Sequence, residues 1–299
     1  MKRALGISIA ALLMMPLCVS ATEVNAQTSQ TSTTTAEIRV RVFASAAMEK
    51  PLRQLGYQFQ KQHPNVAIHY EFAASRVFMI GIEQGIPPDL FVSAGEKYQD
   101  QLTNSASVNL FSTLAHDHLV AVTPCGPPPP CCEAQGVSDS SGITEKSLVT
   151  SLMNPDMVLT IASPTLSPAG QATIDIFKEM DKKRPGAYQK IMGHAKEVMD
   201  VDLVARAVAH RESNIGILYA SQVTGLERQG ECVREVPIPS SYHTQMPFTV
   251  SVLNKSRFHA VDAERKEVDK DLEALYLSKA GQKVLAEWGF APANAIARK

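Results

Sequence analysis

Apolar and polar residues alternate along this chain with periods that predict a series of strands and helices. Residues 38–43 alternate apolar with basic side chains, as a half-buried strand does. Pro51 suits a first helical turn, and an apolar stripe runs from Leu52 to Phe59 before Gln62-His63-Pro64 ends the helix. Residues 66–72 predict the next strand. This order of elements indicates an α/β fold.

The tract 72–93 joins a loop of small residues, a helix and a buried strand. Ala73-Ala74-Ser75 forms the loop, and the helix is expected to run through residues 80–84. Gly85, Pro87 and Pro88 then break the chain before the apolar strand at residues 90–92. A further strand–helix–strand unit of this kind favours parallel strands joined by crossover helices.

The alternation resumes after a Pro- and Ser-rich insertion at residues 125–142. The later pattern predicts strands at 157–161, 215–219 and 248–253, and helices at 170–182, 201–212 and within 262–289. These elements predict a second α/β lobe. We expect lobe I to comprise residues 37–119 and 249–299, and lobe II to comprise residues 120–248.

The first 26 residues are typical of a secretory signal peptide. Lys2 and Arg3 precede an uncharged run, and small residues mark two candidate cleavage points, after Ala21 and after Ala26. A membrane anchor is the alternative, but the run is short for a span and contains Pro16. Lipidation of Cys18 is disfavoured because bulky Leu17 precedes it. We therefore expect cleavage and export to the periplasm.

Residues 27–36 are almost entirely Ser, Thr, Gln and Ala, which predicts a disordered spacer before the folded body. The chain as a whole carries 29 basic and 30 acidic residues. This balance, together with the lack of a basic stripe with interleaved aromatic residues, argues against a nucleic-acid partner.

Four cysteines follow the signal segment: Cys125, Cys131, Cys132 and Cys232. In an oxidising compartment they are expected to form disulfides. The run from Cys125 to Cys132 could close on itself, with the remaining neighbour reaching Cys232, but spacing leaves the pairing open. A cysteine-rich metal site is the alternative, which the absence of paired spacing and adjacent His ligands disfavours.

Four loops at expected helix starts combine small side chains with free backbone N–H groups. They span residues 44–48, 73–76, 163–170 and 199–201. Helix N-termini favour anions, and small residues let the backbone approach a ligand. Ordinary helix capping would explain any single loop. Four such loops spread over both lobes favour a ligand-binding site, although their spacing alone leaves the class of ligand open.

The motifs expected of an enzyme are missing. The chain has eight His and many Ser, but no Gly-x-Ser-x-Gly, His-Glu-x-x-His or Walker-type loop. Asp200 and Asp202 are only a pair of carboxylates, too few for a cation site. The sequence therefore predicts a binding protein without catalysis, without a cofactor and without a protein-coordinated metal cation.

Several short motifs, weak singly but specific in their order and spacing, extend from Val40 to Pro292. They are Val42-Phe43-Ala44, Gln62-His63-Pro64-Asn65-Val66, Ile82-Glu83-Gln84-Gly85, Pro88-Asp89-Leu90-Phe91-Val92-Ser93-Ala94-Gly95-Glu96-Lys97, Pro164 with Pro168-Ala169-Gly170, Ile215-Gly216-Ile217-Leu218-Tyr219, and Gly281-Gln282 with Trp288-Gly289-Phe290. In these motifs the chain resembles the periplasmic molybdate-binding proteins of ABC transporters. The resemblance implies the two-lobed periplasmic-binding-protein type II fold, in which each lobe has a mixed, mainly parallel sheet flanked by helices and the ligand cleft lies between the lobes.

The resemblance also implies a set of ligand donors without counter-charges. Ser75 would donate its hydroxyl and its amide, and Tyr219 its phenolic hydroxyl. Ala169 and Val201 would donate backbone N–H groups. Each of these residues occupies the position of a donor in the family.

The first loop departs from the family pattern, because Ala47 stands where a serine is usual and leaves only an amide. Ser45 is a candidate replacement for the missing hydroxyl if the loop is shifted. Arg76 is a further candidate contact, either pairing with an anion or projecting into solvent.

The resemblance further implies a monomer that captures a tetrahedral oxyanion by hinge closure and presents it to an ABC permease in the inner membrane. Molybdate and tungstate are the expected ligands. Two alternatives remain: a binding protein for another small anion such as sulfate, phosphate or an organic acid, and an exported interaction protein that has lost transport.

Overall fold

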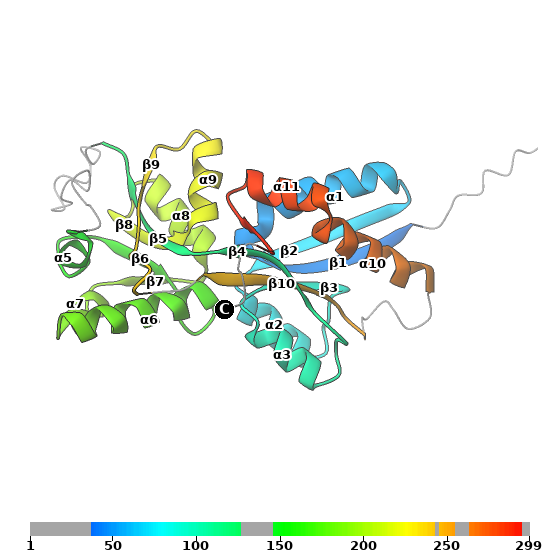
Figure 1. Ribbon diagram of the computed structural model, residues 1–299, viewed down its shortest axis with the longest axis horizontal. Coiled ribbons are helices and arrows are strands. Elements are labelled where there is room, and N and C mark those ends of the chain that lie inside the picture. The colour runs from blue at the N-terminus through cyan, green and yellow to red at the C-terminus, as the bar shows by residue number, and fades with distance from the viewer. Residues whose placement is uncertain (1–36, 127–145, 243–244, 255–262, 295–299) are drawn as a thin grey trace, which may run out of the picture. The chain divides into compact units, whose positions relative to one another are not determined.

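The computed structural model describes residues 37–126, 146–242, 245–254 and 263–294 (Figure 1). The expected signal peptide and spacer, most of the insertion, and Cys131 and Cys132 lie outside these residues. Within them, no helix is long and apolar enough to cross a membrane.

The described residues form two sheets, of which the first has six strands in the order β11-β4-β10-β3-β1-β2. Their bounds are β1 Ile38–Ser45, β2 Val66–Ala73, β3 Leu90–Ala94, β4 Ser112–Asp117, β10 Met246–Val252 and β11 Ala291–Pro292. The second sheet has five strands in the order β7-β6-β8-β5-β9. Their bounds are β5 Leu119–Pro124, β6 Leu159–Ala162, β7 Lys196–Val198, β8 Ile215–Tyr219 and β9 Val233–Val236.

Helices cover both faces of each sheet (Figure 1). Around the first sheet they are η1 Ala46–Met48, α1 Glu49–Gln62, α2 Ser75–Glu83, α3 Lys97–Asn104, α10 Ala263–Leu277 and α11 Lys279–Glu287. Around the second they are α5 Leu148–Leu152, α6 Pro168–Lys183, α7 Ala187–Met192, α8 Val201–Ala209 and α9 Ala220–Arg228. The α/β class predicted from the sequence is confirmed.

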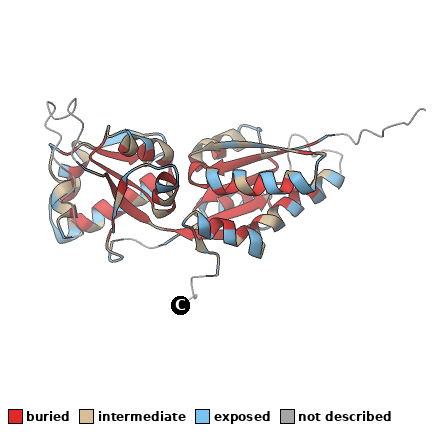
Figure 2. Ribbon diagram, turned by 90° about the horizontal axis from the view of Figure 1, so that it is seen from above, coloured by how far each residue is buried: buried red, intermediate tan, exposed pale blue. Residues whose placement is uncertain are grey.

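The alternation in β1 explains how both faces of the first sheet are covered. Val40 and Val42 are fully buried in a core cluster with Leu52 of α1. Phe43 points the other way and stacks on Phe78 of α2, with ring centroids 4.5 Å apart. The buried residues fill the strands and the inner helix faces in Figure 2, which leaves the exposed residues on the outer helix faces.

The expectation that most strand pairs in each sheet are parallel is wrong. In the described parts of the chain, four strand pairs are parallel (β1–β2, β1–β3, β6–β7 and β6–β8), and five are antiparallel. The antiparallel pairs involve strands that enter from the other sheet or from the C-terminus. Such strands have no crossover helix to force a parallel direction. Both sheets are therefore mixed, as expected, without being mainly parallel.

The chain crosses from the first sheet to the second at one residue, His118, which separates β4 from β5. It returns to the first sheet in β10, which lies between β3 and β4. Near the C-terminus, the helical region expected at 262–289 is divided at Ser278, whose Oγ accepts a bond from the Gly281 amide and caps α11.

Candidate functional site

Ser75 is the first residue of α2 and is fully buried. The Ala94 amide at the end of β3 donates to Ser75 Oγ over 3.2 Å. A hydroxyl has one proton and two acceptor sites, so accepting this bond leaves the Ser75 proton to be donated elsewhere. The position at a helix N-terminus adds positive potential, which suits an anionic acceptor.

Arg76 connects two of the four predicted loops through its backbone. Its amide donates to the carbonyl of Leu166, in the loop before α6, over 3.1 Å. Its guanidinium instead contacts Glu83 on the same helix, with Nη1 and Oε1 3.2 Å apart. The side chain is one-third exposed, and its charge is already matched by this carboxylate.

Ala169 lies in the first turn of α6, behind Pro168, and is fully buried. The neighbouring Gly170 explains how the helix start comes so close to the end of β6. A Cβ atom at Gly170 would overlap the carbonyl oxygens of Ala162 and Ser163. Only glycine therefore permits this approach, which places the Ala169 amide at the end of the strand.

Val201 is the first residue of α8 and is buried. The carboxylate of the preceding Asp200 accepts bonds from the Asp202 and Leu203 amides at 3.1 and 3.2 Å, so this cap does not engage the Val201 amide. Burial, and then the charge of Asp200, raise the pKa of Asp202. Two carboxylates at this helix start weaken its attraction for an anion.

The first loop meets α8 as well. The short helix η1, which contains Ala47, packs against α8. Ala47 is buried and brings no hydroxyl. Ser45 precedes η1, is also buried, and makes no capping bond with its side chain.

Tyr219 ends β8 and is buried. Its hydroxyl donates to Met246 Sδ over 2.9 Å, and its ring meets Phe248 edge to face with centroids 5.1 Å apart. Burial, followed by the charge of Asp117, raises the pKa of Tyr219 well above its ordinary value. The hydroxyl therefore stays protonated and can act as a hydrogen-bond donor.

Asp117, at the end of β4, was missed by the sequence prediction. Its Oδ1 accepts from the His118 amide at 2.7 Å, and its Oδ2 accepts from the Ser221 amide at 3.2 Å. Ser221 lies in the first turn of α9, directly after Tyr219 and Ala220. Asp117 thus caps the helix that begins at the predicted tyrosine donor. No local pattern reveals this bond, because it joins residues 104 positions apart.

The chain matches the model of a known protein family. The model of the family described as bacterial extracellular solute-binding protein matches residues 40–291. The chain belongs to this family. Among its relatives, the molybdate-binding protein ModA of Haemophilus influenzae is 25% identical over 258 residues, covering 85% of this chain and 91% of that protein. The resemblance found in the sequence motifs is thereby confirmed.

Solved structures support the same fold. The periplasmic molybdate-binding protein of Azotobacter vinelandii matches with a TM-score of 0.66 and 16% identity, covering 87% of this chain and 100% of the other. The sulfate-binding protein SubI of Mycobacterium tuberculosis matches with a TM-score of 0.68 and 16% identity, covering 87% and 88%. The periplasmic-binding-protein type II fold is thus confirmed.

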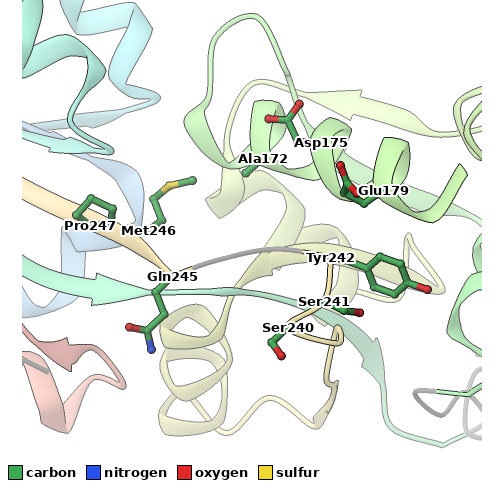
Figure 3. A pocket seen from close by; sticks show the side chains of 9 residues that line it. All are labelled: Ala172, Asp175, Glu179, Ser240, Ser241, Tyr242, Gln245, Met246 and Pro247. Carbon is green, nitrogen blue, oxygen red and sulfur yellow. The ribbon is translucent and has the colours of Figure 1, made fainter. Parts of the chain in front are cut away.

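A pocket of about 550 Å³ in this solute-binding protein lies next to the bond between Tyr219 and Met246, and the residues that line it include none of the predicted donors (Figure 3). Met246 lines it from the start of β10, whereas Asp175 and Glu179 line it from α6. The two carboxylates make this wall acidic. The predicted donors, in contrast, are buried residues at helix starts and strand ends.

Burial raises the pKa of Asp117 from 3.8 to about 7, against the lowering effect of its bonds to Ser221 and His118. The unfolded chain releases this proton near pH 4, so the folded protein binds more protons between about pH 4 and 7. The folded state consequently loses stability as the pH rises from about 4 to about 7, and the loss is complete above the folded pKa. Relative to the unaltered protein, Asp117→Asn is expected to be about 2–3 kcal/mol more stable at pH 8 than at pH 5.

Urea unfolding of both proteins at pH 5 and pH 8 measures this difference. Glu235→Gln is the matched control, since it removes a nearby carboxylate on β9 without altering the α9 cap. An Asp117→Asn effect of equal size at both pH values would show that the carboxyl does not change its protonation state between pH 5 and pH 8, contrary to this prediction.

Proposed function

We propose that this solute-binding protein captures a tetrahedral oxyanion, with molybdate or tungstate as the first candidates, and delivers it to an ABC permease. The observation that carries the proposal is the buried Ser75 hydroxyl at the start of α2, which accepts from the Ala94 amide and keeps its proton for a ligand. The ligand-binding set is Ser75, Ala169, Val201, Tyr219 and Ala47, with Ser45 as a further hydroxyl.

Uncharged donors suit a fully ionised oxyanion, because they supply hydrogen bonds without needing counter-ions. Arg76 already pairs with Glu83, which favours a site built from hydroxyls and amides over one built on an ion pair. The name of the Haemophilus influenzae relative supports molybdate. The missing hydroxyl at Ala47 favours sulfate or another small anion as the second candidate.

We further propose that the protein acts in the periplasm as a monomer after removal of its signal peptide, without catalytic activity. Lobe I would comprise residues 37–119 and 249–299, and lobe II residues 120–248, with closure about the two crossings between the sheets. The bond from the Arg76 amide to Leu166 is the kind of contact that closure would form between the lobes.

Thermal denaturation of the mature protein tests the proposal, with molybdate, tungstate, sulfate, phosphate and small carboxylates each added in turn. A ligand raises the melting temperature according to the logarithm of its saturation. Molybdate and tungstate are expected to give the largest shifts. A shift by sulfate or phosphate alone would move the assignment to the second candidate, and no shift by any anion would contradict anion binding.

Replacing Met246 with leucine is expected to tighten oxyanion binding about two- to fivefold. The Tyr219 hydroxyl donates to Met246 Sδ, a weak acceptor that would compete with an anion for this proton. Leucine fills a similar volume but cannot accept, so about 0.5–1 kcal/mol of competition is removed. Calorimetric titration with molybdate measures the change.

Met180→Leu is the matched control, since Met180 is buried in α6 and takes no part in the Tyr219 bond. Weaker binding by Met246→Leu alone would mean that the methionine supports the tyrosine in the bound state.

A further inference from the structure

Asp117 is a buried carboxylate placed at the crossing between the two sheets, beside the anion site proposed above. Its side chain is 1% exposed. Its two oxygens hold the amides of His118 and Ser221, and the Ala220 amide donates to the His118 carbonyl over 3.0 Å. The crossing and the start of α9 are thus bonded together through the two residues that follow Tyr219.

The charged and titratable groups around Asp117 come from several elements. His118 Nδ1 lies 3.8 Å from Asp117 Oδ1. Burial, followed by the charge of Asp117, raises the pKa of Tyr219 in β8. The charge of Glu235 in β9 repels the Asp117 carboxylate and contributes to raising the pKa of Asp117. On the β10 side, Asp117 pairs with the uncharged Met246. The surroundings therefore oppose the carboxylate charge more than they neutralise it.

A second negative charge brought to Tyr219 would be resisted by an ionised Asp117, because the two lie in a region that excludes water. We propose that Asp117 couples oxyanion binding at Tyr219 to the uptake of one proton from solvent. This rests on the proposed function. The proton neutralises the carboxylate as the anion enters, and it returns to solvent when the anion leaves.

The proton can reach Asp117 from solvent beside His118. Its arrival weakens the cap of α9 only in part. The His118 side chain is 43% exposed and touches the carboxylate, so it connects the buried oxygen with solvent. A protonated carboxyl keeps an oxygen that can accept from one amide. Asp117 consequently acts as a positioning residue for Tyr219 in both states, while its charge sets the dependence of affinity on pH.

Linkage gives the sign of this dependence. Burial raises the pKa of Asp117 to about 7, and the negative charge of a bound anion would raise it further. Binding therefore takes up protons near neutral pH, and affinity increases as the pH falls. For one linked proton, affinity changes by at most tenfold per pH unit, so a gain of about tenfold is expected from pH 8 to pH 6.

The test is calorimetric titration of the mature protein with molybdate at pH 6, 7 and 8, in two buffers of different ionisation enthalpy that report proton uptake. The unaltered protein is expected to bind about tenfold more tightly at pH 6 than at pH 8. Asp117→Asn should bind at pH 8 nearly as tightly as the unaltered protein at pH 6, with no proton uptake. His118→Gln and Glu235→Gln should keep the pH dependence.

A measurement on the unaltered protein covers the case in which Asp117→Asn does not fold. Infrared difference spectra should show a protonated carboxylic acid appearing when molybdate is added at pH 7.5. Binding that is independent of pH would overturn this inference and leave the proposed function standing. A pH dependence that persists in Asp117→Asn, or that disappears in His118→Gln, would overturn it as well. Lack of binding by any oxyanion would overturn both.

Discussion

Combined replacement of Ser75 by alanine and Tyr219 by phenylalanine is expected to weaken oxyanion binding by roughly a hundredfold or more. Each change removes one hydroxyl donor to a charged ligand, which costs on the order of 1.5–3 kcal/mol, or about ten- to a hundredfold in affinity. The Ser75 change is expected to act directly, because the buried hydroxyl accepts from the Ala94 amide and keeps its own proton for donation to the ligand. Calorimetric titration of the single and double variants measures these losses.

Matched controls separate the loss of a donor from the loss of a buried hydroxyl in general. Ser93→Ala removes a buried hydroxyl that donates to the carbonyls of Ala94 and Gly95. Tyr242→Phe removes a phenol that lines the neighbouring pocket. Both controls are expected to bind like the unaltered protein. Binding by the double variant that matches these controls would remove Ser75 and Tyr219 from the site.

Loss of the Cys125–Cys232 disulfide is expected to lower the free energy of unfolding by about 4–5 kcal/mol. The bond joins the residues next to β5 and β9, with Cα atoms 5.3 Å apart and a sequence separation of 107 residues. Closing so long a loop restricts the unfolded chain strongly. The double replacement Cys125→Ser and Cys232→Ser should lower the melting temperature by roughly 10–15 °C.

The single replacements Cys125→Ser and Cys232→Ser serve as the comparison, since either one removes the bond. Each should lose as much stability as the double variant. A single variant with the stability of the unaltered protein would mean that its remaining cysteine pairs with Cys131 or Cys132. Non-reducing peptide mapping distinguishes these pairings directly.

The elements with a clear local period were predictable from the sequence. The alternation at the start of β1 and the apolar stripe of α1 placed both elements to within a few residues. Strands β4 and β5 were missed, since residues 114–124 are almost continuously buried apart from His118 and show no alternation. The excess of antiparallel pairs was missed because strand direction depends on crossings between distant parts of the chain.

In the candidate site, too, the features with a local sequence signal were predictable and those that depend on distant contacts were not. Small residues before helix starts indicated the regions of Ser75, Ala169 and Val201, because capping and close backbone approach leave a local trace. The bond from Tyr219 to Met246 and the cap from Asp117 to α9 leave none, since they depend on how the two sheets meet.

Strand β10 joins the first sheet only late in the synthesis of the chain. Residues 246–252 fill the place between β3 and β4, so the N-terminal half of that sheet lacks its central neighbour until the chain has emerged almost completely. A chain threaded outward from its N-terminus would therefore carry two unpaired strand edges while it is in transit. If the chain is exported as proposed, completion of the first sheet would follow translocation, and a fragment that stops before Met246 should depend on chaperones to avoid aggregation.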